Sequence, residues 1–194
     1  MKAVGNNIFV KISKKYKDEI VFANGKKLYL DPSYDKFKHR TVDGIVTSVP
    51  PHLEDVFQEG DRVWYHHSII WNKDNEIDSE NNIFKVQYDR GDTFDCLVYL
   101  IERDGKRWTT NHYVFLDPIK PTIEEKVGSI YIPKMTEEKD FSAVVAYCND
   151  RLPNECDGCN VGDTIVFAKN SEYVLNIDGK DLYRTRLENI LATI

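Results

Sequence analysis

Three cysteines in the second half of the chain have the spacing that comes closest to a metal site. Cys148 is followed by Cys156 and Cys159, and the last two form a Cys-x-x-Cys pair around an Asp-Gly turn. Such a turn can place two thiolates on one zinc ion, with Cys148 as a third ligand. A structural zinc site normally has four ligands and no fourth is obvious, so reduced surface or half-buried thiols are the alternative. We predict no bound metal and no cofactor.

Two adjacent histidines, His66 and His67, follow a stretch that alternates like a β-strand. Because neighbouring residues of a strand point to opposite faces, this pair is not expected to share a metal ion, and we interpret both as solvated side chains. The sequence also lacks the motifs of nucleophilic hydrolases, P-loop proteins and zinc peptidases. We therefore do not expect the chain to be an enzyme.

Two apolar triplets in polar, glycine-containing surroundings have the pattern of a protein-binding loop. They are Leu28-Tyr29-Leu30 and Ile130-Tyr131-Ile132. A loop of this composition can stay disordered until a partner orders it, and several weak contacts of this kind strengthen one another in an assembly. Short apolar runs are also common in core strands, which is the alternative for both triplets.

The elements that must position these residues are predicted to be strands. Alternating apolar and polar residues predict strands at 7–12, 44–49, 61–65, 83–88, 96–101, 113–116, 143–146, 164–167, 182–185 and 190–194. Asn-Gly and Asp-Gly pairs supply turns between them, and residues 51–57 are the best candidate for a helical turn. Many short strands separated by such turns predict an all-β sandwich or barrel.

Segments of the first half recur in the same order in the second half. The sequence GDRVWY beginning at Gly60 matches GDTIVF beginning at Gly162, and the two triplets have the same separation of 102 residues. Two further matches, 44–47 with 143–146 and 9–10 with 115–116, keep the order. We interpret the repeat as duplication of a module of about a hundred residues. The predicted modules are 1–106 and 107–194, joined near Asp104-Gly105 by a turn compatible with a hairpin.

The second half of the chain resembles the GroES-type co-chaperonins. Residues 128–133 resemble the mobile-loop motif of that family, 160–167 resemble its VGD-x-V-x-F strand, and 178–180 with 189–194 resemble its closing segment. The first half is similar at 7–11, 27–32 and 59–63 but carries a long polar insertion at 66–82. The resemblance implies two tandem GroES-like, partly open small β-barrels.

The resemblance also implies a function. Members of the family cap a GroEL-type chaperonin ring during ATP-dependent folding, and an apolar triplet in a loop docks in a groove on that ring. By this likeness the chaperonin-binding residues are Leu28, Tyr29, Leu30, Ile130, Tyr131 and Ile132, in a chain expected to form a homo-oligomer. The alternative is a structural or adaptor protein that keeps the barrel and the oligomer interface but has lost chaperonin binding.

Charge and hydropathy exclude other partners. The formal net charge is -6 with a sequence pI near 5.4, and such a surface repels the phosphate backbone of nucleic acids. The longest apolar run, 96–101, is far too short to cross a bilayer, and the first residues lack the apolar segment of a signal peptide. We expect a cytoplasmic protein with no nucleic-acid or membrane partner.

Overall fold

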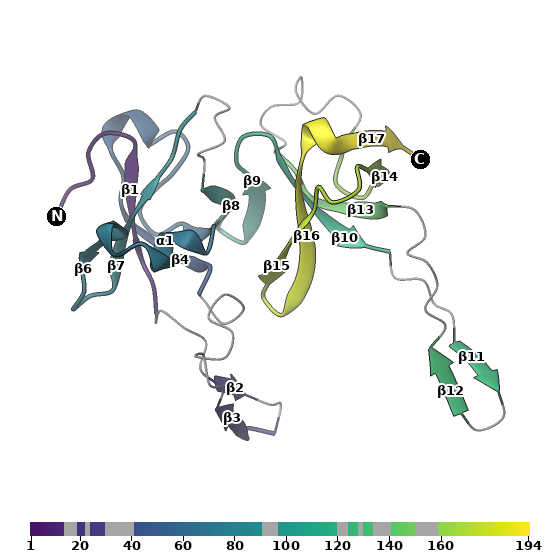
Figure 1. The fold of residues 1–194 in the computed structure, drawn as a ribbon. Coiled ribbons are helices and arrows are strands. Elements are labelled where there is room, and N and C mark those ends of the chain that lie inside the picture. Colours follow the sequence, from purple (N-terminus) through teal and green to yellow (C-terminus); the bar gives the residue numbers. More distant parts are fainter. Residues whose placement is uncertain are drawn as a thin grey trace. The chain divides into compact units, whose positions relative to one another are not determined.

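The computed structural model describes residues 1–13, 19–21, 24–29, 41–90, 97–119, 124–127, 130–133, 141–149 and 159–194. The chain is all-β and folds as two compact units, Met1–Asn111 and His112–Ile194. Each unit is built on one large antiparallel sheet that does not close on itself, so each is a small, partly open β-barrel (Figure 1). The predicted fold class is therefore confirmed.

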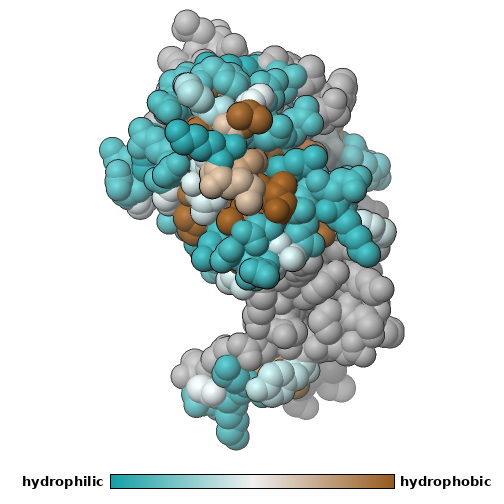
Figure 2. Space-filling view, turned by 90° about the vertical axis from the view of Figure 1, so that its left-hand side faces the viewer, coloured by the Kyte–Doolittle hydropathy of each residue, from teal (hydrophilic) through white to brown (hydrophobic). Residues whose placement is uncertain are grey.

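The first unit contains a seven-stranded sheet in the order β6-β7-β1-β4-β5-β8-β9. Its strands are β1 (Asn7–Lys11), β4 (Asp43–Ser48), β5 (Arg62–Tyr65), β6 (Glu76–Asp78), β7 (Ile83–Gln87), β8 (Val98–Arg103) and β9 (Lys106–Thr109). Alternate residues point inward, so that Ile8 and Val10 of β1 are fully buried. Figure 2 views this unit from the side of β6 and shows a mostly hydrophilic surface around a smaller hydrophobic group.

The second unit contains a six-stranded sheet in the order β15-β16-β10-β13-β14-β17. Its strands are β10 (Tyr113–Pro118), β13 (Ser142–Tyr147), β14 (Thr164–Phe167), β15 (Tyr173–Ile177), β16 (Lys180–Arg186) and β17 (Ile190–Thr193). A buried hydrophobic cluster of this unit is formed by Val114, Leu116, Ala143, Val145, Cys148, Cys159, Ile165 and Phe167.

The two large sheets have matching topology. The first six strands of the first sheet, in the order β6-β7-β1-β4-β5-β8, correspond one by one to β15-β16-β10-β13-β14-β17 of the second sheet. Strand β9 has no counterpart among the described strands of the second sheet. The irregularity between Phe9 and Val10, where β1 pairs with β4, recurs between Phe115 and Leu116, where β10 pairs with β13. The same elements in the same order therefore repeat along the chain.

The short turns before β5 and β14 have the same hydrogen bond and the same glycine conformation. The amide of Gln58 donates to the Asp61 carboxylate over 2.7 Å, and the amide of Asn160 donates to the Asp163 carboxylate over 2.7 Å. A glycine with positive φ precedes each aspartate, at 97° for Gly60 and 96° for Gly162. This backbone conformation favours glycine, which explains the Gly-Asp pair that the sequence repeats.

Other parts differ from the sequence prediction. Strands β6, β9 and β15 were not predicted, and the insertion at 66–82 is folded into α1 (Ser68–Trp71), η2 (Lys73–Asn75) and β6. Ile69 and Ile70 of α1 are buried. The 3₁₀ turn η1 (Pro51–Leu53) lies where the sequence indicated a helical turn at 51–57, and a second 3₁₀ turn, η3 (Leu187–Asn189), was not predicted. In the part of the chain that the structure describes, no helix is long and apolar enough to cross a membrane.

Candidate functional site

The first apolar triplet lies in a small sheet of its own. Strand β2 (Glu19–Val21) pairs antiparallel with β3 (Lys27–Tyr29), and this two-stranded sheet is separate from the large one (Figure 1). The side chains of Leu28 and Tyr29 are 48% and 73% exposed, so they are not part of a core. Leu30 lies outside the described residues. The structure thus presents two adjacent apolar side chains to solvent.

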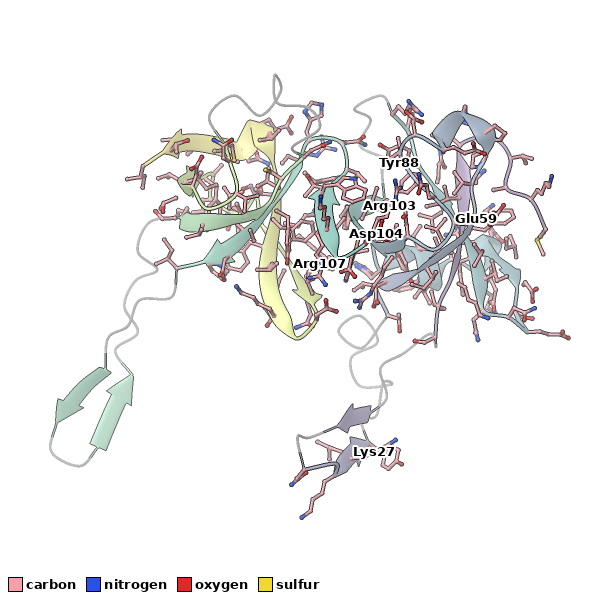
Figure 3. The ribbon with its side chains drawn as sticks, turned by 180° about the vertical axis from the view of Figure 1, so that it is seen from behind. Lys27, Glu59, Tyr88, Arg103, Asp104 and Arg107 are labelled. Carbon is pink, nitrogen blue, oxygen red and sulfur yellow. The ribbon has the colours of Figure 1, made fainter. Side chains whose placement is uncertain are left out.

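A turn orients this strand. Gly25 has a φ of 77°, and the amide of Lys26 donates to the Asn24 side-chain oxygen over 3.0 Å. Side chains of Asn frequently form such local hydrogen bonds at turns, which explains the Asn-Gly pair just before β3. Figure 3 labels Lys27, the first residue of β3.

The second triplet occupies the equivalent place in the second unit. Strand β11 (Glu124–Val127) pairs with β12 (Ile130–Pro133), so that Ile130 lies opposite Val127, Tyr131 opposite Lys126, and Ile132 opposite Glu125. Like β2 and β3, these strands form a separate sheet, and they lie in sequence between the first and second strands of their barrel. The second triplet, and Leu28 and Tyr29 of the first, therefore lie in strands of two-stranded sheets, outside the large sheets.

The outer edge of the first unit's large sheet is the other conspicuous feature. Strands β8 and β9 form a hairpin around Asp104 and Gly105, whose φ values are 52° and 75° (Figure 3). Two positive φ values in a two-residue loop match the twist of the flanking strands. The hairpin places Glu102 opposite Arg107 and lays β9 along the outer edge of β8.

Arginine side chains fasten this hairpin to the sheet. Arg103 donates two hydrogen bonds of 2.7 Å to Asp61, which is 2% exposed, and a third of 3.2 Å to the Val56 carbonyl. The bonds to Asp61 raise the pKa of the Arg103 guanidinium. Arg107 forms an ion pair of 2.5 Å with Glu102 and lies 5.1 Å from the Trp64 ring. The turn aspartate of the first unit thus also anchors the end of β8 at this hairpin.

The two histidines differ from the sequence prediction. Their rings lie close together, with centroids 4.1 Å apart, although the sequence predicted that they point to opposite faces. The reason is that β5 ends at Tyr65 and His67 has the helical angles φ -57° and ψ -22°, so the alternation of a strand does not apply to this pair. Within the described ranges, no group of three or more histidine, cysteine or acidic side chains could hold a metal ion.

The structure describes two of the four cysteines. Cys148 and Cys159 are buried in the second unit's core, and are not surface or half-buried groups as the sequence suggested. They occupy the space of small hydrophobic residues beside β13 and β14. Cys96 and Cys156 lie outside the described residues, and with Cys156 the proposed zinc pair does too.

Comparison with known proteins identifies the second unit. Residues 109–194 match the family Cpn10, the Chaperonin 10 Kd subunit, so this part of the chain is a domain of the GroES family. The match covers less than half of the chain and begins at the last residue of β9. No curated protein matches the chain. The family supports a co-chaperonin-like role in general terms.

Proposed function

We propose that this protein is a co-chaperonin, which caps a GroEL-type chaperonin ring and assists ATP-dependent protein folding through its two apolar triplets. The observation that carries the proposal is the equivalent placement of the triplets, each in a separate two-stranded sheet following the first strand of a barrel. In the first unit this placement leaves Leu28 and Tyr29 exposed. In the second unit it occurs inside a Cpn10 family domain.

The duplication belongs to this proposal. The matching strand order, the repeated irregularity between the first and second barrel strands and the paired Gly-Asp turns support descent of both barrels from one module. Two modules in one chain bring two docking triplets together. A second weak contact then forms at a high effective concentration, which strengthens binding without a tighter individual contact. In this proposal the chain acts in the cytoplasm as a homo-oligomer, takes no cofactor and is not an enzyme.

The direct test is capture of a purified chaperonin ring on the immobilised protein, with and without ATP. The double variant Leu28→Asp, Ile130→Asp is expected to lose capture, because a carboxylate in an apolar groove is strongly unfavourable. Val174→Asp is the matched control, since Val174 is an exposed apolar residue (54%) on β15 in the barrel. Capture that persists in the double variant refutes the contact. A wild-type chain that is never captured favours the structural or adaptor alternative.

A further inference from the structure

The two segments that carry the apolar triplets differ in charge. Residues 12–42, between β1 and β4, contain eight lysine or arginine residues and four acidic ones, which gives a net charge of +4. Residues 119–141, between β10 and β13, contain four basic and five acidic residues, which gives -1. The whole chain has a net charge of -6, so the first segment is a positive part of an acidic protein. The equivalent segments of the two units therefore carry opposite charge.

Two exposed lysines of the first segment stand directly before its triplet. Lys26 donates its amide to the Asn24 side chain in the turn, and Lys27 is the first residue of β3 (Figure 3). At the same place in the second segment the sequence has Gly128 and Ser129. The two hairpins thus present similar apolar residues next to different polar ones.

The geometry of β3 places these side chains on two faces. Lys27 and Tyr29 are two residues apart and lie on one face, and Leu28 lies on the other. A groove that receives Leu28 and Tyr29 therefore also comes within reach of the Lys27 ammonium group. Covering an ammonium group without a counter-charge is costly, whereas a carboxylate at the border of the groove forms a charge-assisted hydrogen bond with it.

Phosphate is the other anion that such cations attract, and the hairpin suits a nucleic acid less well than a protein. Glu19 lies directly opposite Tyr29 in the small sheet, where a phosphate backbone would be repelled. Leu28 has no aromatic face on which a base could stack, although it is as near to Lys27 as Tyr29 is not. A protein groove with an apolar floor and an acidic border matches all of these side chains.

We propose, on the basis of the co-chaperonin function proposed above, that the β2–β3 hairpin docks on an apolar groove bordered by carboxylates. Leu28 occupies the apolar part, and Lys26 and Lys27 meet the acidic border. The β11–β12 hairpin, whose triplet follows Gly-Ser in the sequence, docks by apolar contact alone. Salt therefore weakens the first contact and leaves the second nearly unchanged, so the two hairpins of one chain suit chemically different positions on the partner.

The test is the affinity of a purified chaperonin ring for the immobilised full chain, measured with ATP between about 50 and about 500 mM salt. Lys26→Gln combined with Lys27→Gln is expected to weaken binding about three- to tenfold at the lowest salt, because two exposed ion pairs are lost. Screening should reduce the difference to less than about twofold at the highest salt. Lys73→Gln combined with Lys106→Gln is the matched control, since both lysines are exposed in the first unit and outside the small sheet.

Further variants identify the charge and the hairpin that act. Lys26→Arg combined with Lys27→Arg keeps both cations and is expected to retain wild-type affinity. The glutamine pair is expected to have its full effect in an Ile130→Asp chain, in which the first hairpin supplies the remaining contact, and little effect in a Leu28→Asp chain. Far-UV circular dichroism checks that each variant keeps the wild-type spectrum.

The outcomes separate this inference from the proposed function. A wild-type chain that is never captured refutes the proposed function and the inference with it. If the wild-type chain is captured, the inference alone is overturned when the glutamine pair binds as the control does, when the arginine pair binds as weakly as the glutamine pair, or when the glutamine pair acts equally in the Leu28→Asp chain. Loss of binding to a labelled single-stranded oligonucleotide, with ring capture unchanged, would assign the cations to a nucleic acid instead.

Discussion

Replacing Arg103 by methionine should destabilise the first unit strongly, because it leaves a carboxylate buried without its cation. Asp61 is 2% exposed and accepts two hydrogen bonds of 2.7 Å from Arg103. Removing one partner of a buried ion pair typically costs about 3–5 kcal/mol. The Arg103 side chain is 19% exposed, so water can reach part of the site, and we expect a loss of about 2–4 kcal/mol in the free energy of unfolding.

Tryptophan fluorescence can follow this loss in one unit alone. All three tryptophans, Trp64, Trp71 and Trp108, lie in the first unit. With a urea dependence of about 2 kcal/mol/M, the fluorescence midpoint should fall by about 1–2 M. Far-UV circular dichroism records both units, so the part of its signal that belongs to the second unit should keep its midpoint.

The control for this experiment is a surface ion pair in the same unit. Arg90 pairs with Asp55, and their side chains are 47% and 63% exposed. Arg90→Met is expected to leave the urea midpoint unchanged, because solvent screens exposed pairs. The reasoning about Asp61 would be refuted if Arg103→Met also left the midpoint unchanged, or shifted it no further than Arg90→Met does.

Three further predictions concern stability. Burial raises the pKa of Tyr65 well above its usual value of 10.0. The protonated phenol therefore stabilises the fold below pH 10, and this contribution is lost as the pH rises further. Tyr65→Phe should make the urea midpoint fall less steeply at alkaline pH. A Cβ on Gly44 would lie 2.7 Å from the Lys11 carbonyl oxygen, so Gly44→Ala should cost about 1–3 kcal/mol, measured by the same unfolding curves. Gly60→Ala and Gly162→Ala have open space but positive φ, so each should cost about 1–2 kcal/mol in its own unit; unequal losses would contradict the equivalence of the turns.

The parts of the fold that could be predicted from sequence are those whose burial comes from alternating aliphatic and aromatic residues. The strand predicted at 164–167 is β14, in which Ile165 and Phe167 are buried. Strand β15 carried the same signal, because Leu175 and Ile177 alternate just before an Asp-Gly turn. Its absence from the prediction was therefore avoidable.

Strand β9 could not be found in this way. Its sequence, Lys-Arg-Trp-Thr, has no apolar alternation, because arginine contacts and an ion pair with β8 hold it in place. Since β9 belongs to the first sheet, the compact units divide after Asn111, whereas the sequence placed the modules at 1–106 and 107–194. The prediction that His66 and His67 point to opposite faces was wrong for another reason. The strand ends at Tyr65 and His67 has helical backbone angles, so the alternation of a strand does not extend to this pair.

For the candidate site, composition identified the triplets but not their partner strands. β2 is Glu-Ile-Val and β11 is Glu-Glu-Lys-Val, and neither has enough residues to show a period. The pairing partner of such a short strand depends on the turn that connects the two strands and on backbone hydrogen bonds, and sequence periodicity contains no information on either. The small sheets therefore emerge only from the structure.

The place of β9 in the first sheet also sets an order of events during synthesis. β8 leaves the ribosome before β9, so the nascent first barrel briefly exposes an unpaired edge. At roughly 5–20 residues per second, the few residues from Arg103 to Thr109 follow within about a second. The hairpin closes locally around Asp104 and Gly105, faster than a contact with another nascent chain can form. The first sheet is thus completed by the last strand of its own unit, translated just before the second unit begins.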